Sequence, residues 1–318
     1  MTEPTNWLPP FMQETYRSTN LRTIDDVEWP NGARCCVSIH VHVDGQTVWR
    51  ALGMEKLVYI SNGEYGPRTA VWRLLRLLKQ YGIKASFFIP GWTAETYPQM
   101  VRAIAGAGHE VGHHSYSHTL ADMGLTDDGE WDKAVEEREF DRALTILQDM
   151  SGQEINGYVP PGGELSPHSI DILLSRGIRY QAQCAADDIP YWWEINGESC
   201  GLLEIPTHWS VDDAPQFLYT LIPQTGFIKG PDEVFGMWKG DFDAYRHYGR
   251  CLVFQVHPQW IGRPGRLRMF ERLIQHIQSH SDVWWATGRE IDAYWRDRYS
   301  PDVVRALTDN TLRKGAPK

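Results

Sequence analysis

The sequence contains few cysteines, fewer basic than acidic residues, and no long apolar run. Its five cysteines among 318 residues are irregularly spaced without a CxxC pair, which predicts free, mostly buried thiols in a reducing compartment. The longest apolar stretches, such as CLVFQV at 251–256, have the length of a strand and are too short to span a bilayer. Lys and Arg number 31 against 41 Asp and Glu, and they form no basic block, so we expect neither nucleic acid nor a membrane surface as partner.

Other signals are missing as well. The first twenty residues have neither the basic start nor the apolar segment of a secretory signal, and we expect a cytoplasmic protein. No GxGxxG follows the first predicted strand, and no GxxxxGK[ST] occurs. These two absences argue against a dinucleotide-binding fold and a P-loop nucleotide site.

The sequence does contain a regular alternation of strand-like and helix-like segments from about residue 33 onward. Strands are expected at 34–43, 84–90, 109–112, 155–161, 178–183, 202–207, 250–258 and 282–287. Helices are expected at 67–82, 94–108, 129–152, 166–177, 231–248, 264–280 and 288–297. This order predicts an α/β fold with a parallel sheet and right-handed crossovers, built as a distorted, incomplete (β/α) barrel. We divide the chain into an N-terminal arm (1–30), the barrel (31–300) and a C-terminal tail (301–318).

Polar side chains follow several predicted strands at their carboxyl ends. His42 and Asp44 alternate on one face after the first strand. His114 and His118 follow 109–112, and His257 follows 250–256. Because the carboxyl ends of barrel strands form the face where active sites lie, we expect these residues to converge.

The segment AGHEVGHHSYSH at 107–118 contains four histidines, two of which are candidate metal ligands. His114 and His118 are four residues apart, so on one helical turn they would face the same way. With Asp44 they would make a two-histidine, one-carboxylate site for Zn²⁺, Co²⁺, Ni²⁺ or Fe²⁺. A chance surface pair is the alternative. We expect His109 and His113 to be solvated or to support the ligands rather than to bind metal.

Further candidates lie in the loop after 178–183. Asp187 and Asp188 would orient substrate or His257, although loop acids are often only solvated. Tyr191 and Trp192 follow in the expected loop and would form the wall of a pocket for a small planar ligand, or else pack ordinarily.

Taken together, the motifs resemble those of the polysaccharide deacetylase (NodB-like) family over roughly residues 30 to 298. HVDG, HSYSH, YVPPGG and FQVHP match the family's motifs in order. The resemblance implies that Asp44, His114 and His118 bind one divalent transition metal, with zinc as the first choice. It also implies that His257 protonates the leaving nitrogen and that Pro161 of the third motif lies at the substrate.

Within the family the chain is similar to a cytoplasmic branch. This branch contains cyclic imide hydrolases, a metal-independent allantoinase and a Helicobacter-type peptidoglycan deacetylase homologue. GYVPPGGELSPHS, YQAQCAADDIPYWW and LEIPTHWSVDDAPQF carry this similarity. The resemblance implies a homo-oligomer, specifically a homotetramer.

The chain departs from the family pattern at two positions. The family's second aspartate, its general base, is replaced by Val43 in the common alignment or by His42 in the D-x-D alignment of the branch. A neutral imidazole at position 42 can act as a base, become a further ligand, or be an inert replacement. The arginine that usually precedes the prolines of the third motif is Val159 here, so both members of that charged pair are absent.

We therefore weigh several functions. The first is metal-dependent hydrolysis, through an activated water, of a non-peptide C–N bond in a small cyclic amide or imide, with His42 and His257 as catalytic residues. The second is removal of an acetyl group from an acetylated sugar or peptidoglycan fragment. The third is a catalytically idle homologue that binds a small molecule. Metal-free ureide hydrolysis is a fourth, disfavoured because all three ligand positions are intact.

Overall fold

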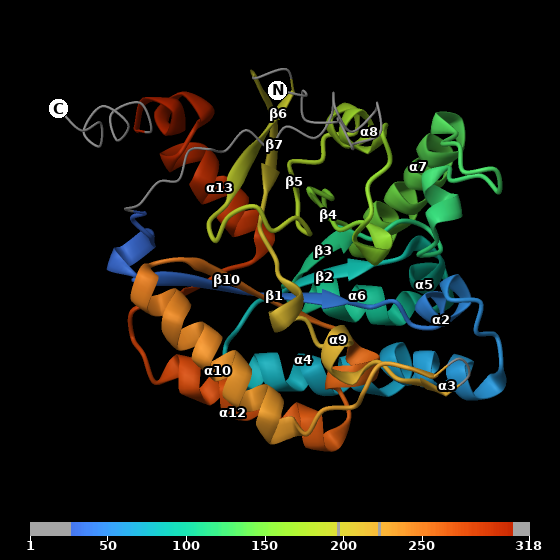
Figure 1. The fold of residues 1–318 in the computed structure, drawn as a ribbon, viewed down its shortest axis with the longest axis horizontal. Helices are drawn as coiled ribbons and strands as arrows, with labels where there is room; N and C mark the ends of the chain where they lie inside the picture. Colours follow the sequence, from blue (N-terminus) through green and yellow to red (C-terminus); the bar gives the residue numbers. More distant parts are fainter. Residues whose placement is uncertain (1–26, 196–197, 222–223, 308–318) are drawn as a thin grey trace, which may run out of the picture.

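The computed structural model describes residues 27–195, 198–221 and 224–307. Its main sheet has nine strands. Eight follow the order β10-β1-β2-β3-β4-β5-β7-β6 (Figure 1), and β11 is paired to the first part of β1. All pairings in this sheet are parallel except that of β6 with β7. The α/β fold with a mostly parallel sheet, predicted from the alternation of segments, is confirmed.

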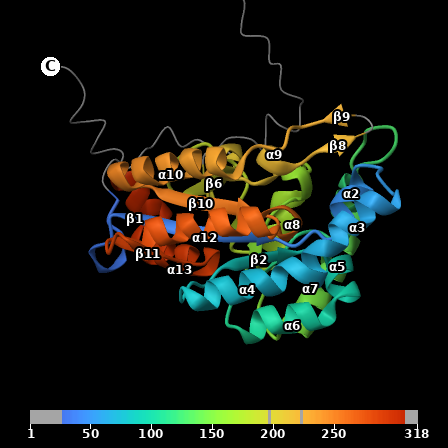
Figure 2. The same cartoon turned by 90° about the horizontal axis from the view of Figure 1, so that it is seen from below.

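The sheet comprises β1 (Cys35–His42), β2 (Ser86–Ile89), β3 (Glu110–His113), β4 (Gly157–Tyr158), β5 (Tyr180–Gln181), β6 (Tyr191–Ile195), β7 (Glu198–Glu204), β10 (Cys251–Val256) and β11 (Val283–Trp285). The longer helices are α3 (Leu57–Tyr65), α4 (Val71–Gln80), α6 (Pro98–Gly106), α7 (Lys133–Ser151), α8 (Ser169–Ser175), α10 (Pro231–Tyr248), α12 (Pro264–Gln278) and α13 (Gly288–Arg298). Shorter helices are α2 (Thr47–Ala51), α5 (Gly91–Thr96), α9 (Ala214–Phe217) and α11 (Pro258–Ile261). A separate hairpin of β8 (Thr220–Leu221) and β9 (Gln224–Thr225) lies beside α2 and α3 (Figure 2).

The barrel is incomplete, as expected from the sequence. The paired order ends at β10 on one side and at the β6–β7 hairpin on the other. The chain that follows β7 spans part of this gap, because Asp212 forms an isolated parallel bridge with Gln255 of β10. The segment after β7 is thereby held next to the carboxyl end of β10.

Strand β1 lies at the centre of the protein and is buried along its whole length. Its odd-numbered residues, such as Val37 and Ile39, belong to the core shared with the outer helices α4, α10 and α12. On the other face, Cys36 belongs to a second core with Tyr180 and Trp295 of α13. Burial on both faces is typical of a parallel strand and explains the nearly continuous apolar run at 34–43.

The structure differs from the predicted elements in three places. The expected helix at 94–108 is two helices, α5 and α6, separated at Tyr97, with Pro98 at the first position of α6. Proline fits there because the first helical N–H needs no acceptor within the helix. Residues 47–65, for which we predicted no element, form α2 and α3. The expected loop that contains Tyr191 and Trp192 is strand β6, paired with β7.

The two ends of the chain are described only in part. Of the expected arm, residues 1–26 lie outside the described residues, whereas Trp29 is buried and its ring lies 6.0 Å from those of Trp284 and Trp295. Of the expected tail, residues 301–307 are helical, and 308–318 with the expected frayed end lie outside the described part. None of the five cysteines, all of which lie in the described part of the chain, forms a disulfide. No helix in the described part is long and apolar enough to cross a membrane.

Candidate active site

The three predicted metal ligands meet at the carboxyl ends of β1 and β3. Asp44 follows β1, and its Oδ1 lies 3.4 Å from Nε2 of His114 and 3.9 Å from Nε2 of His118. One donor atom from each residue lies within 4.8 Å of the other two. Asp44 and His114 are fully buried, which is unusual for a carboxylate unless it is paired or binds a metal.

The hydrogen bonds around these residues leave the facing atoms available to a cation. His114 Nδ1 lies 2.7 Å from the carbonyl oxygen of Val159, to which it donates, and Gln259 donates to Asp44 Oδ2 at 3.1 Å. Asp44 Oδ1 and His114 Nε2 are buried and have no hydrogen-bond partner within the described residues. An imidazole anchored through one nitrogen, with the other nitrogen facing a carboxylate, is the arrangement of metal-ligating histidines. The residues therefore fit one divalent transition metal.

His114 and His118 converge through a loop, and the helical turn assumed from their spacing is wrong. Ser115 and His118 have φ values of 58° and 63°, in the left-handed region that an α-helix does not use. The Ser115 hydroxyl accepts a hydrogen bond from the His118 amide at 3.0 Å. This local bond holds the turn that brings His118 back toward Asp44.

His257 follows β10 and is held by a carboxylate that sequence reasoning did not identify. Its Nδ1 lies 2.7 Å from Asp213 Oδ1, and its Nε2 lies 3.7 Å from Asp44 Oδ2. Burial alone would lower the pKa of His257, but the Asp44 and Asp213 carboxylates outweigh burial and raise it to about 9. The two carboxylates therefore favour the protonated ring, whose Nε2 lies on the side of Asp44.

Asp212 and Asp213 are the main functional candidates that the sequence reasoning missed. They lie in VDDAPQF, after the strand expected at 202–207. Asp212 Oδ1 is 3.7 Å from His257 Nδ1, and burial raises the pKa of Asp212 to about 7. Two acids following a strand were the available signal, but only the bridge to β10 shows that they reach His257.

His42 lies between the ligand His114 and the candidate acid His257. Its ring centroid is 5.1 Å from that of His114 and 4.9 Å from that of His257. Burial, followed by the neighbouring His257 and His114, lowers the pKa of His42 well below its usual value. A neutral His42 whose buried Nε2 has no partner within the described residues can accept a proton.

The three candidate metal ligands, together with His42 and His257, line a cavity of about 540 Å³. Apolar and aromatic groups form much of its wall, including Leu52, Trp209 and Trp260, and Pro161 lines it as expected. Glu164, which follows the third motif, lines it as well. Within the described part of the chain, the lining contains neither lysine nor arginine, so an anionic substrate group would meet no side-chain cation except protonated His257.

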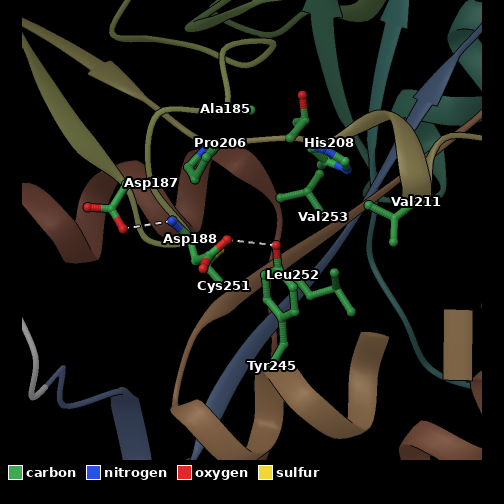
Figure 3. A pocket seen from close by; sticks show the side chains of 11 residues that line it. Ala185, Asp187, Asp188, Pro206, His208, Val211, Tyr245, Cys251, Leu252 and Val253 are labelled. Atoms are coloured by element: carbon green, nitrogen blue, oxygen red, sulfur yellow. Dashed lines mark hydrogen bonds between the residues drawn. The ribbon is translucent and has the colours of Figure 1, made fainter. Parts of the chain in front are cut away.

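Asp187 and Asp188 do not line this cavity, contrary to expectation. They border a separate pocket of about 50 Å³ beside the start of β10 (Figure 3). Asp187 accepts a hydrogen bond from the Asp188 amide at 2.7 Å, and Asp188 accepts one from the Tyr245 hydroxyl at 2.9 Å. The physical reason is that the Asp188 carbonyl pairs with the amide of Cys251, the first residue of β10, whereas His257 follows its last.

Tyr191 and Trp192 are also absent from the cavity wall. They belong to β6 and are only 3% and 4% exposed. Trp192 Nε1 donates to the carbonyl of Tyr299 at 2.8 Å, and its ring packs in the core shared with α13. Pairing of β6 with β7 turned the expected loop into a buried strand, so Trp209 and Trp260 provide the aromatic wall instead.

The other two histidines of 107–118 are buried rather than solvated. His109 Nδ1 accepts a hydrogen bond from the Ala85 amide at 3.2 Å. His113 stacks on Phe140, lies 3.1 Å from the Phe140 carbonyl through Nε2, and accepts the Ser115 amide through Nδ1. His113 therefore supports the loop that carries the ligands, as one of the two roles we expected for it.

Comparisons with known proteins agree with this geometry. The Polysaccharide deacetylase family matches residues 55–181, which include His114 and His118. A peptidoglycan deacetylase of Helicobacter pylori is 31% identical over 257 residues, covering 73% of this chain and 85% of that protein. A putative polysaccharide deacetylase from Mycobacterium smegmatis has a structure that superposes with a TM-score of 0.79 at 30% identity, covering 87% of this chain and 96% of the other.

An allantoinase structure is similar as well, with a TM-score of 0.73 at 26% identity over 86% of this chain and 94% of that one. The identity and coverage of these matches, taken with the motifs, show what kind of protein this is. The chain belongs to the polysaccharide deacetylase family and is a hydrolase of carbon–nitrogen bonds other than peptide bonds.

Proposed function

We propose that the protein is a metal-dependent amide hydrolase that removes an acetyl group from the nitrogen of an acetylated amino sugar or peptidoglycan fragment. The observation that carries the proposal is the placement of His257 next to the Asp44, His114 and His118 cluster in one cavity. The similarity to a Helicobacter pylori peptidoglycan deacetylase supports the acetylated sugar as substrate.

Asp44, His114 and His118 would hold the metal ion through one carboxylate oxygen and two imidazole nitrogens. When bound, such an ion polarises an amide carbonyl and lowers the pKa of a water molecule. The hydrogen bonds from His114 to Val159 and from Gln259 to Asp44 fix the orientation of two of these ligands before the metal arrives. This preorganisation is what a ligand set needs for catalysis as well as for binding.

The two remaining histidines start in different protonation states, because burial lowers the pKa of His42 and the Asp44 and Asp213 carboxylates raise that of His257. Neutral His42 takes one proton from the attacking water as its oxygen bonds to the acyl carbon. His257 gives its Nε2 proton to the nitrogen as the C–N bond breaks, so the products are acetate and a free amine. Asp213 stays ionised and keeps the His257 ring in place through Nδ1. The different surroundings of His42 and His257 thus provide one base and one acid for the same reaction.

Hydrolysis of a small cyclic amide or imide is a second candidate, favoured by specific features of the cavity. His42 and Val159 stand where the family usually has an aspartate and an arginine, and the wall is rich in apolar and aromatic groups. The similarity to an allantoinase, at 26% identity, points to a ring amide as well. The same two histidines would serve ring opening, in which the leaving nitrogen stays attached to the product.

One experiment separates these candidates. The purified chain, loaded with Zn²⁺ or Co²⁺, is incubated in parallel with chito-oligosaccharides, with cyclic imides and hydantoins, and with N-acetylglucosamine. Release of acetate supports deacetylation, and ring opening with no acetate supports the second candidate. The His114→Ala variant is the matched control and should be inactive in both assays. Turnover of neither substrate class by the metal-loaded protein would contradict both candidates.

A further inference from the structure

A second group of metal-type ligands lies on the outer helical layer, apart from the catalytic cavity. Asp243 belongs to α10, His276 to α12, and His280 follows the end of α12. One donor atom from each lies within 4.8 Å of the others. None of the three is among the residues that line the catalytic cavity. Helices α10 and α12 pack against each other here, so the cluster joins two separate elements of the chain.

The two histidines are held side by side in a way that favours shared binding. They are four residues apart, and their ring centroids are 5.2 Å apart. Both rings make edge-to-face contacts with Phe242, whose ring centroid is 5.6 Å from that of His276 and 5.5 Å from that of His280. This apolar support from α10 restricts the movement of both rings, which lowers the entropy that a metal ion must overcome on binding.

The two imidazoles differ in how they meet the carboxylate. His276 Nε2 donates a hydrogen bond to Asp243 Oδ1 at 2.7 Å, so a metal ion bound between these two atoms takes the place of that proton. His280 Nδ1 is 3.1 Å from the carbonyl oxygen of His276, so that nitrogen carries the proton and Nε2 has the free lone pair. Anchoring of one ring nitrogen on a backbone carbonyl is the arrangement that metal-binding histidines use.

Two cations lie near this cluster. Lys239 Nζ is 2.6 Å from Asp243 Oδ2, on the carboxylate oxygen that does not face His276. Arg246 is occupied by Asp282, at 2.7 Å and 2.9 Å. Lys239 is 40% exposed on its side chain, so it can swing into solvent when another cation takes its place. Competition from Lys239 weakens the site but does not block it.

We propose that Asp243, His276 and His280 form a second site for a divalent transition metal such as Zn²⁺, Co²⁺ or Ni²⁺, which connects α10 to α12. One carboxylate oxygen and two imidazole nitrogens are the ligand types that these ions prefer, with solvent completing the coordination. We assign it a structural role, because its ligands join two helices that pack against each other. It does not depend on the function proposed above.

The test uses the full-length chain with the first site removed by Asp44→Asn and His114→Ala together. After chelator treatment, this double variant is titrated with Co²⁺ and with Zn²⁺ by calorimetry. We expect one ion per chain and, for Co²⁺, visible absorption bands that report imidazole nitrogen ligands. Addition of His276→Ala and His280→Ala should abolish both signals. The matched control is His247→Ala on α10, an exposed histidine outside the cluster, which should change neither.

Two further measurements guard against misfolding of the variants and against chance surface binding. In the double variant, Lys239→Met should tighten Co²⁺ binding by about tenfold, since it removes an ammonium group next to the site. Zn²⁺ should raise the melting temperature of the double variant, because it binds only where α10 and α12 are packed together. Absence of binding at millimolar Co²⁺, or binding that survives loss of both histidines, would overturn the proposal.

Discussion

Asp213 accepts hydrogen bonds from both the ring and the backbone of His257, at 2.7 Å from Nδ1 and 2.9 Å from the amide nitrogen. The two bonds share one oxygen, Oδ1, so the carboxylate fixes the ring relative to its own backbone. The other ring nitrogen is then directed toward Asp44. This relationship sets both the charge and the orientation of the proposed acid, and it leads to the first prediction.

Replacement of Asp213 by Asn should lower kcat by about 100-fold or more, because His257 loses the charge that keeps it protonated and oriented. The KM should change much less, since Asp213 is not among the residues that line the cavity. Steady-state kinetics with the substrate found in the screen measure both constants. A rise in KM with kcat unchanged would show that Asp213 acts in binding instead. Metal content should equal that of the unaltered protein and serves as the check on folding.

Loss of a ligand should remove the metal from the first site. In Asp44→Asn and in His114→Ala, metal per chain should fall by one ion, as measured by mass spectrometry on protein purified without a metal-affinity tag. Activity of the same variants, measured in the substrate screen, should fall to background. His247→Ala, which alters an exposed histidine, should retain both. Unchanged metal content in His114→Ala would contradict the assignment of this residue as a ligand.

His42 should matter for the chemical step and not for metal content. His42→Ala should lower kcat by about 100-fold, the typical contribution of a general base, while the metal stays bound. Loss of the metal together with activity would instead identify His42 as a fourth ligand. Full activity in His42→Ala would show that the residue is an inert replacement for the aspartate of the family. His42→Asp, which introduces the carboxylate, should recover part of the rate.

His40 should make the protein sensitive to acid. It is fully buried, neither ring nitrogen has a partner within the described residues, and burial lowers its pKa to about 3. The unfolded chain binds this proton near pH 6.5 but the folded chain does not. Stability from neutral His40 is therefore present above pH 6.5 and is lost as pH falls toward 3, at up to about 1.4 kcal/mol per pH unit.

Urea unfolding of the unaltered chain and of His40→Leu at pH 7.5 and pH 5 checks this sign. The free energy of unfolding should fall less on acidification in His40→Leu, because His109, His113 and the other buried histidines contribute equally to both proteins. An equal fall in the two proteins would contradict the prediction.

The subunit count stays a prediction from the family resemblance. Light scattering coupled to gel filtration should give a mass about four times the 36.5 kDa of one chain. Several large apolar side chains are exposed on the single chain, including Leu57 at 85% and Phe227 at 79%, and contact between subunits would cover such groups. A mass equal to one chain would contradict the expectation.

The sequence alone was enough for the order of most of the elements and for all three candidate metal ligands. Buried parallel strands need continuous apolar runs, and amphipathic helices need apolar residues at helical spacing, so both leave local patterns. Residues just after a strand in a parallel sheet lie at one edge, so Asp44, His114 and His257 were expected to converge, as they do.

What only the tertiary structure decided is which loops reach that edge. Asp188 and Asp213 are both loop acids that follow a strand, and no local pattern distinguishes them. A backbone pairing turns Asp188 toward the start of β10, and another brings the segment of Asp212 and Asp213 to its end. Likewise, Trp192 was assigned to a loop and became a core residue when β6 paired with β7. Such outcomes depend on contacts between residues far apart in the chain, and these contacts leave no periodic pattern in the sequence.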